Sequence, residues 1–230
     1  MLDFGYYNMD CMQGMKEFPD GYFDLAIVDP PYGGVTRGGY MNNKMSGGVA
    51  VNRNDYVLDL WVQDAPPQEY FDELFRVSKN QIIWGANYFI EQIKKNSQCW
   101  VVWDKDKPEG VGYADVELAW TSFNRSAKIF RFTWNGMIQG DMKNKERKIH
   151  PTQKPKALYK WLLRNFAETG NKILDTHVGS ASSLCACNEL GFDYVGFELS
   201  EKYYESSKAR LDQVKRQVNI MELMNDWRLP

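Results

Sequence analysis

The sequence predicts an α/β fold in which helices cover both faces of a mostly parallel sheet. Residues 25–28, Leu-Ala-Ile-Val, form a continuous apolar run of the kind that is buried on both faces of such a sheet. Helices and strands are expected to alternate in the last third of the chain, which is the pattern of βαβ units. The expected helices there are 152–167, 180–190 and 200–218, and the expected strands are 172–175 and 194–197.

The first two thirds of the chain are less regular. An amphipathic helix is expected at 68–77, where Tyr70, Phe71, Leu74 and Phe75 recur at helical spacing. The other expected elements are strands at 3–7, 81–85, 100–103, 116–121 and 128–134, a helical turn at 12–17 and a helix at 88–95. We expect one domain over residues 1–230, with mobile basic insertions at about 33–67 and 135–151.

The composition is that of an ordinary globular protein. Of the 230 residues, 43% are hydrophobic and 25% are charged, and 28 Lys and Arg oppose 30 Asp and Glu. A formal charge of −2 excludes a histone-like binder, so any surface for nucleic acid must be local. The chain shows no apolar run of the roughly 18 residues that a membrane helix needs. No basic signal-peptide region is recognised at residues 1–10.

The four cysteines, Cys11, Cys99, Cys185 and Cys187, lack the spacing of a zinc site. We therefore expect structural thiols in a reducing, cytoplasmic setting, and no metal.

Two strand ends carry unusual residues, and ligands of open α/β sheets bind beyond the carboxyl ends of the strands. The first is the glycine turn Asp175-Thr176-His177-Val178-Gly179-Ser180, and Glu198 ends the next strand. Glycine allows close backbone approach, and an acidic residue at that distance can accept from ribose hydroxyls, so this layout suits a nucleoside cofactor. A plain strand–helix connection is the alternative for the turn alone.

The second strand end is Asp29-Pro30-Pro31-Tyr32. A carboxylate and a rigid proline carbonyl can accept the two protons of an exocyclic amine and localise its lone pair for attack on an electrophile. The tyrosine ring can stack on a base taken out of the duplex. The alternative is a Pro-Pro turn that stops a strand, with Tyr32 as packing.

These motifs, together with His150-Pro151-Thr152-Gln153-Lys154-Pro155, resemble the permuted (β-class) S-adenosylmethionine-dependent amino-DNA methyltransferases, in which the catalytic motif precedes the cofactor motif. The resemblance implies a three-layer, Rossmann-like fold with a seven-stranded, mostly parallel sheet and one antiparallel strand. It also implies that Asp29, Pro30, Pro31 and Tyr32 hold the target base. By the same resemblance the cofactor residues are Asp10, Thr152, Lys154, Asp175, His177, Gly179, Ser180 and Glu198.

The resemblance assigns Asp10 to the adenine ring and Glu198 to the ribose. It assigns Thr152 and Lys154, at an expected helix N-terminus, to the methionine carboxylate. The alternatives are that Asp10 and Thr152 only cap helices.

The cofactor turn departs from the family pattern, Asp-Pro-Phe-x-Gly-Ser-Gly, at Thr176, His177 and Ala181. We expect weakened rather than abolished cofactor binding, because an imidazole is flat like the phenyl ring that it replaces.

Two basic segments are expected to contact DNA phosphates and to make binding salt-dependent. Their residues are Arg37, Lys44, Arg53, Lys143, Lys145, Arg147 and Lys148. The alternative is a solvated charged face. The partner implied is double-stranded DNA, and no association with a membrane is expected. We expect a monomer or homodimer in the cytoplasm of a bacterial or phage-infected cell. Few residues are left for recognition, which indicates a short site or a second subunit.

The function expected is transfer of a methyl group from S-adenosylmethionine to N6 of adenine, with base flipping, as in restriction–modification. Asp at the first position of the tetrapeptide favours adenine within the family. Two alternatives stay open: a cytosine-N4 methyltransferase, and a non-catalytic DNA-binding protein on a methyltransferase scaffold.

Overall fold

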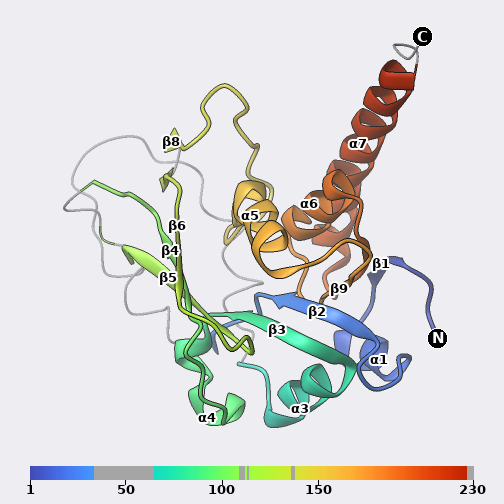
Figure 1. The fold of residues 1–230 in the computed structure, drawn as a ribbon. Coiled ribbons are helices and arrows are strands. Elements are labelled where there is room, and N and C mark those ends of the chain that lie inside the picture. The colour runs from blue at the N-terminus through green and yellow to red at the C-terminus, as the bar shows by residue number, and fades with distance from the viewer. Residues whose placement is uncertain (34–64, 109–111, 113, 136–137, 227–230) are drawn as a thin grey trace. The chain divides into compact units, whose positions relative to one another are not determined.

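A computed structural model describes residues 1–33, 65–108, 112, 114–135 and 138–226 (Figure 1). They divide into two compact units. The first unit comprises Met1–Val28, Glu73–Gln81 and Lys148–Pro230, and the second comprises Asp29–Asp72 and Ile82–Arg147.

The first unit contains a parallel sheet. Its strands are hydrogen-bonded in the order β1 (Gly5–Asn8), β10 (Asp193–Glu198), β9 (Lys172–Asp175), β2 (Phe23–Val28) and β3 (Ser78–Trp84), and the first four residues of β3 belong to this unit. The pairs β1–β10, β10–β9 and β9–β2 are parallel. Asn8 is the partner of Glu198, and Gly196 is the partner of Asp175, so these strands end at one edge.

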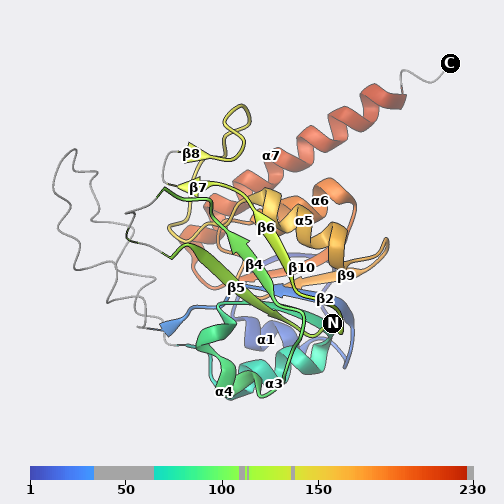
Figure 2. The same ribbon diagram turned by 60° about the vertical axis from the view of Figure 1, so that its left-hand side comes forward.

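Helices cover both faces of this sheet. Figures 1 and 2 show α5 (Lys156–Phe166), α6 (Ser182–Leu190) and α7 (Glu201–Asp226) side by side on one face, and α1 (Cys11–Lys16) on the other. The apolar stripe of α5 is buried at Leu158, Leu162 and Leu163. Gly14 lets α1 lie against β10, because a Cβ at this position would lie 2.3 Å from Phe197 Cε1.

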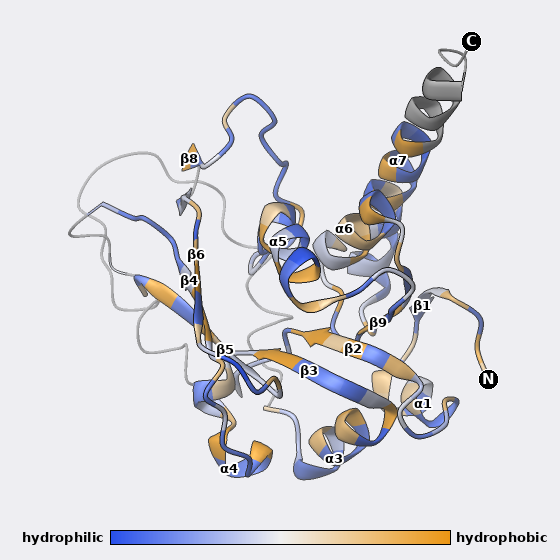
Figure 3. Cartoon of the chain, in the orientation of Figure 1, coloured by the Kyte–Doolittle hydropathy of each residue, from blue (hydrophilic) through white to orange (hydrophobic). Residues whose placement is uncertain are grey.

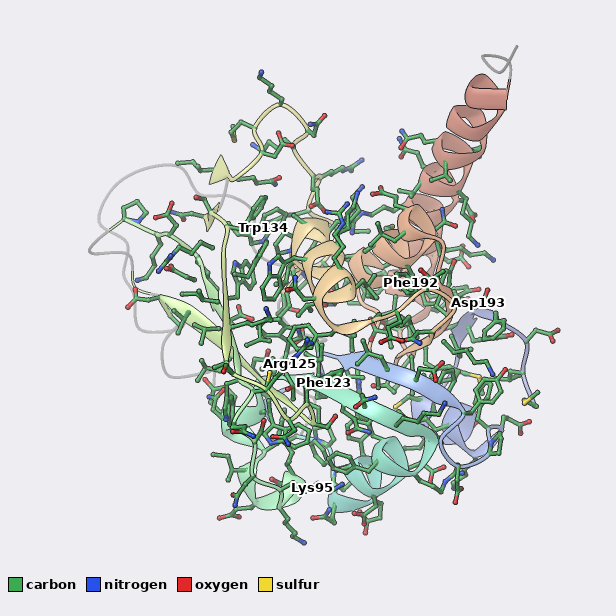
Figure 4. All side chains as sticks on the ribbon, in the orientation of Figure 1. Lys95, Phe123, Arg125, Trp134, Phe192 and Asp193 are labelled. Carbon is green, nitrogen blue, oxygen red and sulfur yellow. The ribbon has the colours of Figure 1, made fainter. Side chains whose placement is uncertain are left out.

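The second unit continues from the last three residues of β3. Its strands follow in the order β3, β5 (Val116–Thr121), β4 (Val101–Asp104) and β6 (Lys128–Arg131), and β5 is antiparallel to both β3 and β4. A hairpin is formed by β7 (Trp134–Asn135) and β8 (Ile138–Gln139). Trp84 and Trp103 meet edge to face in the core of the unit. In the connection from β5 to β6, the Arg125 guanidinium stacks over the Phe123 ring at 4.9 Å (Figure 4).

Three helical segments complete the second unit. They are the first half of α3 (Gln68–Val77), the 3-10 helix η2 (Ala86–Tyr88) and α4 (Ile90–Ile93). We expected one helix at 88–95, but Gly85 and Lys94 both adopt left-handed backbone conformations, and these bound two short turns instead.

The expected mostly parallel α/β sheet with one antiparallel strand is confirmed. The sheet has eight strands rather than seven, because β6 pairs with β4 at its edge. The helix at 68–77 and the strands at 116–121 and 172–175 have the expected bounds. Helix α7 continues to Asp226, beyond the expected 218. Most of the expected insertion at 33–67 lies outside the described residues, and the single domain stays a prediction.

No helix among the described residues is long and apolar enough to cross a membrane.

Candidate active site

The turn after β9 is held by the buried carboxylate of Asp175. Its Oδ1 accepts a hydrogen bond of 3.0 Å from the His177 backbone N–H, and its Oδ2 accepts one from the Ser183 hydroxyl. Gly179 has a φ of +53°, a conformation in which a side chain is strained. The Asp175 carboxylate therefore stabilises the turn that connects β9 to α6.

Glu198 joins this turn to the end of β10. Its Oε2 accepts from the Gly179 N–H and its Oε1 from the Ser200 N–H, each at 2.9 Å. Burial raises the pKa of the Glu198 carboxyl, and these backbone donors partly oppose that rise. Since each carboxylate oxygen has two acceptor sites, Glu198 keeps acceptor capacity for ligand hydroxyls.

Asp10 caps α1, which was the alternative to a cofactor role. Its Oδ1 accepts a 2.7 Å hydrogen bond from the Met12 N–H at the first turn of the helix. Asp10 follows β1, and Glu198 is the last residue of β10. Because β1 and β10 are paired in parallel, both acidic residues lie at the carboxyl ends of the strands. Its contact with a cofactor stays a prediction.

Thr152 and Lys154 do not lie at a helix N-terminus, so that expectation was wrong. Helix α5 begins at Lys156, with Pro155 in extended conformation as its cap residue. A residue that precedes proline is disfavoured in the helical region, which keeps Lys154 out of the helix. The Lys154 side chain is nonetheless buried, 5% exposed, whereas Thr152 is exposed and its hydroxyl lies 3.1 Å from His150 Nδ1.

His150 lies beside the glycine turn, which the sequence did not reveal. Its ring meets Tyr203 edge to face at 4.5 Å, and a Cβ at Gly179 would lie 3.5 Å from its Cε1. Burial, together with the nearby charge of Lys154, lowers the pKa of His150 to about 4. The residue is therefore neutral near pH 7.

His177 is also held neutral. Burial lowers its pKa to about 4, against a small opposing effect of Asp10. Its Nδ1 lies 2.9 Å from the Thr176 hydroxyl. Among the described residues, no group of three or more His, Cys, Asp and Glu side chains is arranged to hold a metal ion.

Arg210 is a second residue whose role the sequence did not reveal. From α7 its Nη1 donates to the Ser180 carbonyl at 2.7 Å and to the Ser182 hydroxyl at 2.9 Å. Ser180 itself is buried, and its hydroxyl lies 3.0 Å from that of Ser182. Ala181, between them, has a φ of +58°. Arg210 thus fixes the backbone where the turn enters α6, and no local pattern could reveal a contact 30 residues away along the chain.

The tetrapeptide Asp29–Tyr32 begins the second unit, directly after β2. The Tyr32 hydroxyl donates a hydrogen bond of 2.7 Å to Asp29 Oδ1. Pro30 is buried, and Asp29, Pro31 and Tyr32 are half-buried. An anionic acceptor and a constrained backbone therefore lie at a partly accessible strand end, which suits binding of an amino group.

Tyr32 is in contact with three residues of the segment 85–89, a proximity that the sequence did not indicate. A Cβ at Gly85 would lie 2.1 Å from Tyr32 Cε1. Tyr88 stacks on Tyr32 with ring centroids 5.2 Å apart and planes inclined by 25°, and Phe89 meets it edge to face at 6.0 Å. The signal available in the sequence was the aromatic pair Tyr88-Phe89, which comes three residues after Gly85 at the end of β3.

The basic residues expected to contact DNA are exposed where the structure describes them. Lys143, Lys145, Arg147 and Lys148 lie in the connection from β8 to α5, which Figure 3 shows as strongly hydrophilic. The Gln139 side-chain amide anchors this connection through two 2.8 Å hydrogen bonds to the backbone of Glu146. The other three expected residues, Arg37, Lys44 and Arg53, lie outside the described residues.

Residues 23–209 match the model of the DNA methylase family. The chain belongs to that family. The expected family, amino-DNA methyltransferases that use S-adenosylmethionine, is thereby confirmed, and the match covers both the tetrapeptide and the glycine turn of this DNA methylase.

Two type II methyltransferases are among the relatives of this DNA methylase. M.HinfI of Haemophilus influenzae is 24% identical and aligns with 94% of this chain and 70% of its own. M.HpaI of Haemophilus parainfluenzae is 27% identical and aligns with 88% of this chain and 72% of its own.

Solved structures share the fold of this DNA methylase. The M1.HpyAVI complex with S-adenosylmethionine has a TM-score of 0.56 at 20% identity, over 89% of this chain and 98% of that one. The cytosine-N4-specific PvuII DNA methyltransferase has a TM-score of 0.58 at 11% identity, over 95% of this chain and 93% of that one.

Proposed function

We propose that this DNA methylase transfers a methyl group from S-adenosylmethionine to the exocyclic N6 amine of adenine in a short site of double-stranded DNA, after flipping the base. The observation that carries the proposal is the tetrapeptide at the end of β2, where Tyr32 orients the Asp29 carboxylate. The match of the chain to the family supports the reaction class.

The residues of the first unit fit a nucleoside cofactor. Gly179 exposes backbone at a φ of +53°, and Glu198, already oriented by two N–H donors, retains acceptor sites for ribose hydroxyls. The carboxyl ends of the strands in this unit also carry other residues that we assign to the cofactor, namely Asp10, Asp175, His177 and Ser180. We assign Thr152 and Lys154 to the methionine carboxylate. When bound, S-adenosylmethionine supplies a methyl group activated by its sulfonium.

The residues of the second unit prepare the nucleophile. Asp29 and the carbonyl of Pro30 each accept a hydrogen bond from the amine, which withdraws the nitrogen lone pair from conjugation with the ring. Pro30 and Pro31 fix φ, so the carbonyl is aimed before the base arrives. Tyr32 offers a ring on which the flipped base stacks. After transfer, the methylated nitrogen returns to neutrality by releasing one proton to solvent.

The choice of adenine rests on Asp29, because the family tends to carry Ser at this position when cytosine is the target. DNA phosphates are assigned to Arg37, Lys44, Arg53, Lys143, Lys145, Arg147 and Lys148. Their contacts make binding salt-dependent. A bacterial or phage-infected cytoplasm suits a protein whose relatives include bacterial type II methyltransferases.

The test is to incubate the purified protein with unmodified phage DNA and isotopically labelled S-adenosylmethionine, and then to digest the DNA to nucleosides. N6-methyladenine as the product supports the proposal, and sequencing of DNA from an expressing host locates the site. N4-methylcytosine as the sole product would show that the target base is cytosine rather than adenine. DNA binding without cofactor binding or transfer would instead establish a non-catalytic DNA-binding protein.

A further inference from the structure

Three contacts on Tyr32 come from the single segment of residues 85–89. Gly85 leaves room for the ring, Phe89 touches its edge and Tyr88 stacks on it. The segment is itself ordered, because the Tyr88 N–H donates to the Gly85 carbonyl at 2.8 Å and the Gly85 N–H donates to the Leu118 carbonyl at 2.9 Å. The position of the Tyr32 ring is therefore set by a turn that is distant along the chain.

Tyr88 differs from the other two contacts because it is partly exposed to solvent. It is 42% exposed, whereas Phe89 is fully buried. Phe89 is accounted for by the core, whereas the stacked geometry of the partly exposed Tyr88 ring points to a role directed at Tyr32. At 5.2 Å and 25°, the two rings have the offset arrangement that aromatic pairs prefer.

We propose that Tyr88 is a positioning residue for the target base. It holds the Tyr32 ring in place, so that the flipped base stacks on that ring with its amine directed at Asp29. This inference rests on the proposed function and deepens it, since it assigns a residue outside the tetrapeptide to engagement of the base.

The spacing of the rings distinguishes this role from a sandwich. A base held between two rings needs centroids about 7 Å apart, twice a contact distance of about 3.5 Å. The observed 5.2 Å leaves no room for a base between Tyr32 and Tyr88. Tyr88 therefore acts through Tyr32, and the removal of Tyr88 must matter only when Tyr32 is present.

The experiment is a double-mutant cycle with Tyr88→Ala, Tyr32→Ala and the double variant, measured on a duplex that contains the mapped site. We expect Tyr88→Ala to raise the KM for DNA about tenfold, the size of one stacking interaction. The Kd for S-adenosylmethionine stays unchanged. Tyr88→Phe, which keeps the ring, restores the KM, and Tyr88→Ala adds no further loss to Tyr32→Ala.

A matched control is Tyr22→Ala. Tyr22 also packs among aromatic rings, Phe18 and Phe23, but it belongs to neither strand end. This variant lowers the melting temperature without changing the KM for DNA. An unchanged KM in Tyr88→Ala, or losses that add in the double variant, would overturn the inference. If the unmodified protein transfers no methyl group at all, it is the proposed function that fails.

Discussion

The Tyr32 hydroxyl donates a 2.7 Å hydrogen bond to Asp29 Oδ1. The ring that is proposed to receive the base and the carboxylate that is proposed to receive its amine thus constrain each other. One oxygen of Asp29 is oriented from within the protein, which fixes the plane of the carboxylate before DNA binds.

Replacement of Asp29 by Ala separates chemistry from cofactor binding. We expect methyl transfer to fall at least about a thousandfold, because the lone pair of the amine is no longer localised, while the Kd for S-adenosylmethionine stays within about twofold. Tyr32→Phe removes only the hydrogen bond to Asp29 and lowers kcat about tenfold. Calorimetry and single-turnover transfer measure the two quantities, and near-native transfer by Asp29→Ala would refute the role of the carboxylate.

Gly85→Ala tests whether Tyr32 must occupy its observed position. The new Cβ would lie 2.1 Å from the Tyr32 ring, so the ring has to move and methyl transfer is lost. Gly191→Ala is the matched control: its φ of +72° is close to the +67° of Gly85, but nothing lies within 4 Å of the new Cβ. Backbone strain is expected to lower the stability of both variants by about 1 kcal/mol, which thermal melts measure. Only Gly85→Ala is expected to lose activity, and equal activity in the two would contradict the prediction.

Arg210→Met tests the support of the glycine turn that is proposed to bind the cofactor. The variant removes charge-assisted hydrogen bonds to the Ser180 carbonyl and the Ser182 hydroxyl, so we expect the Kd for S-adenosylmethionine to rise about tenfold. Turnover at saturating cofactor changes much less. Arg216→Met, an exposed position on the same helix, controls for loss of charge. Equal cofactor affinities in the two variants would show that Arg210 does not position the turn.

The two histidines of the chain, His150 and His177, are expected to make the fold sensitive to mild acid. Burial lowers both pKa values to about 4, so each is neutral in the native state and protonates below about pH 6.5 in the unfolded state. The free energy of unfolding therefore falls as the pH drops from about 6.5 toward 4, by up to about 1.4 kcal/mol per pH unit for each histidine. Urea denaturation at about pH 6.5, 5.8 and 5.0 measures this slope. In His150→Gln/His177→Gln the slope is expected to flatten, and an unchanged slope would assign it to other groups.

Neutralising Lys143, Lys145, Arg147 and Lys148 tests the proposed binding of DNA. These side chains lie at the surface, so their replacement by Gln leaves the fold intact. We expect weaker DNA binding and a salt slope reduced by about 0.9 for each phosphate that the variant no longer neutralises. Binding titrations from about 50 to 200 mM salt measure both. An unchanged affinity would mark the segment as a solvated face.

The strand ends were predictable because they depend on short-range signals. An apolar β-run followed by Asp-Pro-Pro can only end there, and the alternation after residue 152 predicts parallel strands, whose carboxyl ends share an edge. Asp175 and Glu198 consequently lie where the sequence indicated, at the ends of β9 and β10. The start of α5 was misplaced because Thr152 has the chemistry of a cap, whereas Pro155 determines the boundary.

The supporting contacts could not be predicted from local patterns. Tyr88 and Tyr32 are remote from each other in the sequence, and Arg210 reaches Ser180 across 30 residues. Such pairs arise only once the strands and helices have packed. The left-handed conformation of Lys94, which ends α4, was equally hidden, since lysine carries no preference for that region.

The link between Glu198 and the amides of Gly179 and Ser200 has a thermodynamic consequence. The loop that is proposed to meet the nucleoside is ordered when the polypeptide folds, so its conformational entropy would not oppose ligand association. If this loop binds the methyl donor as proposed, donor affinity is expected to depend on direct interactions rather than on loop closure, and the donor can bind before the DNA does.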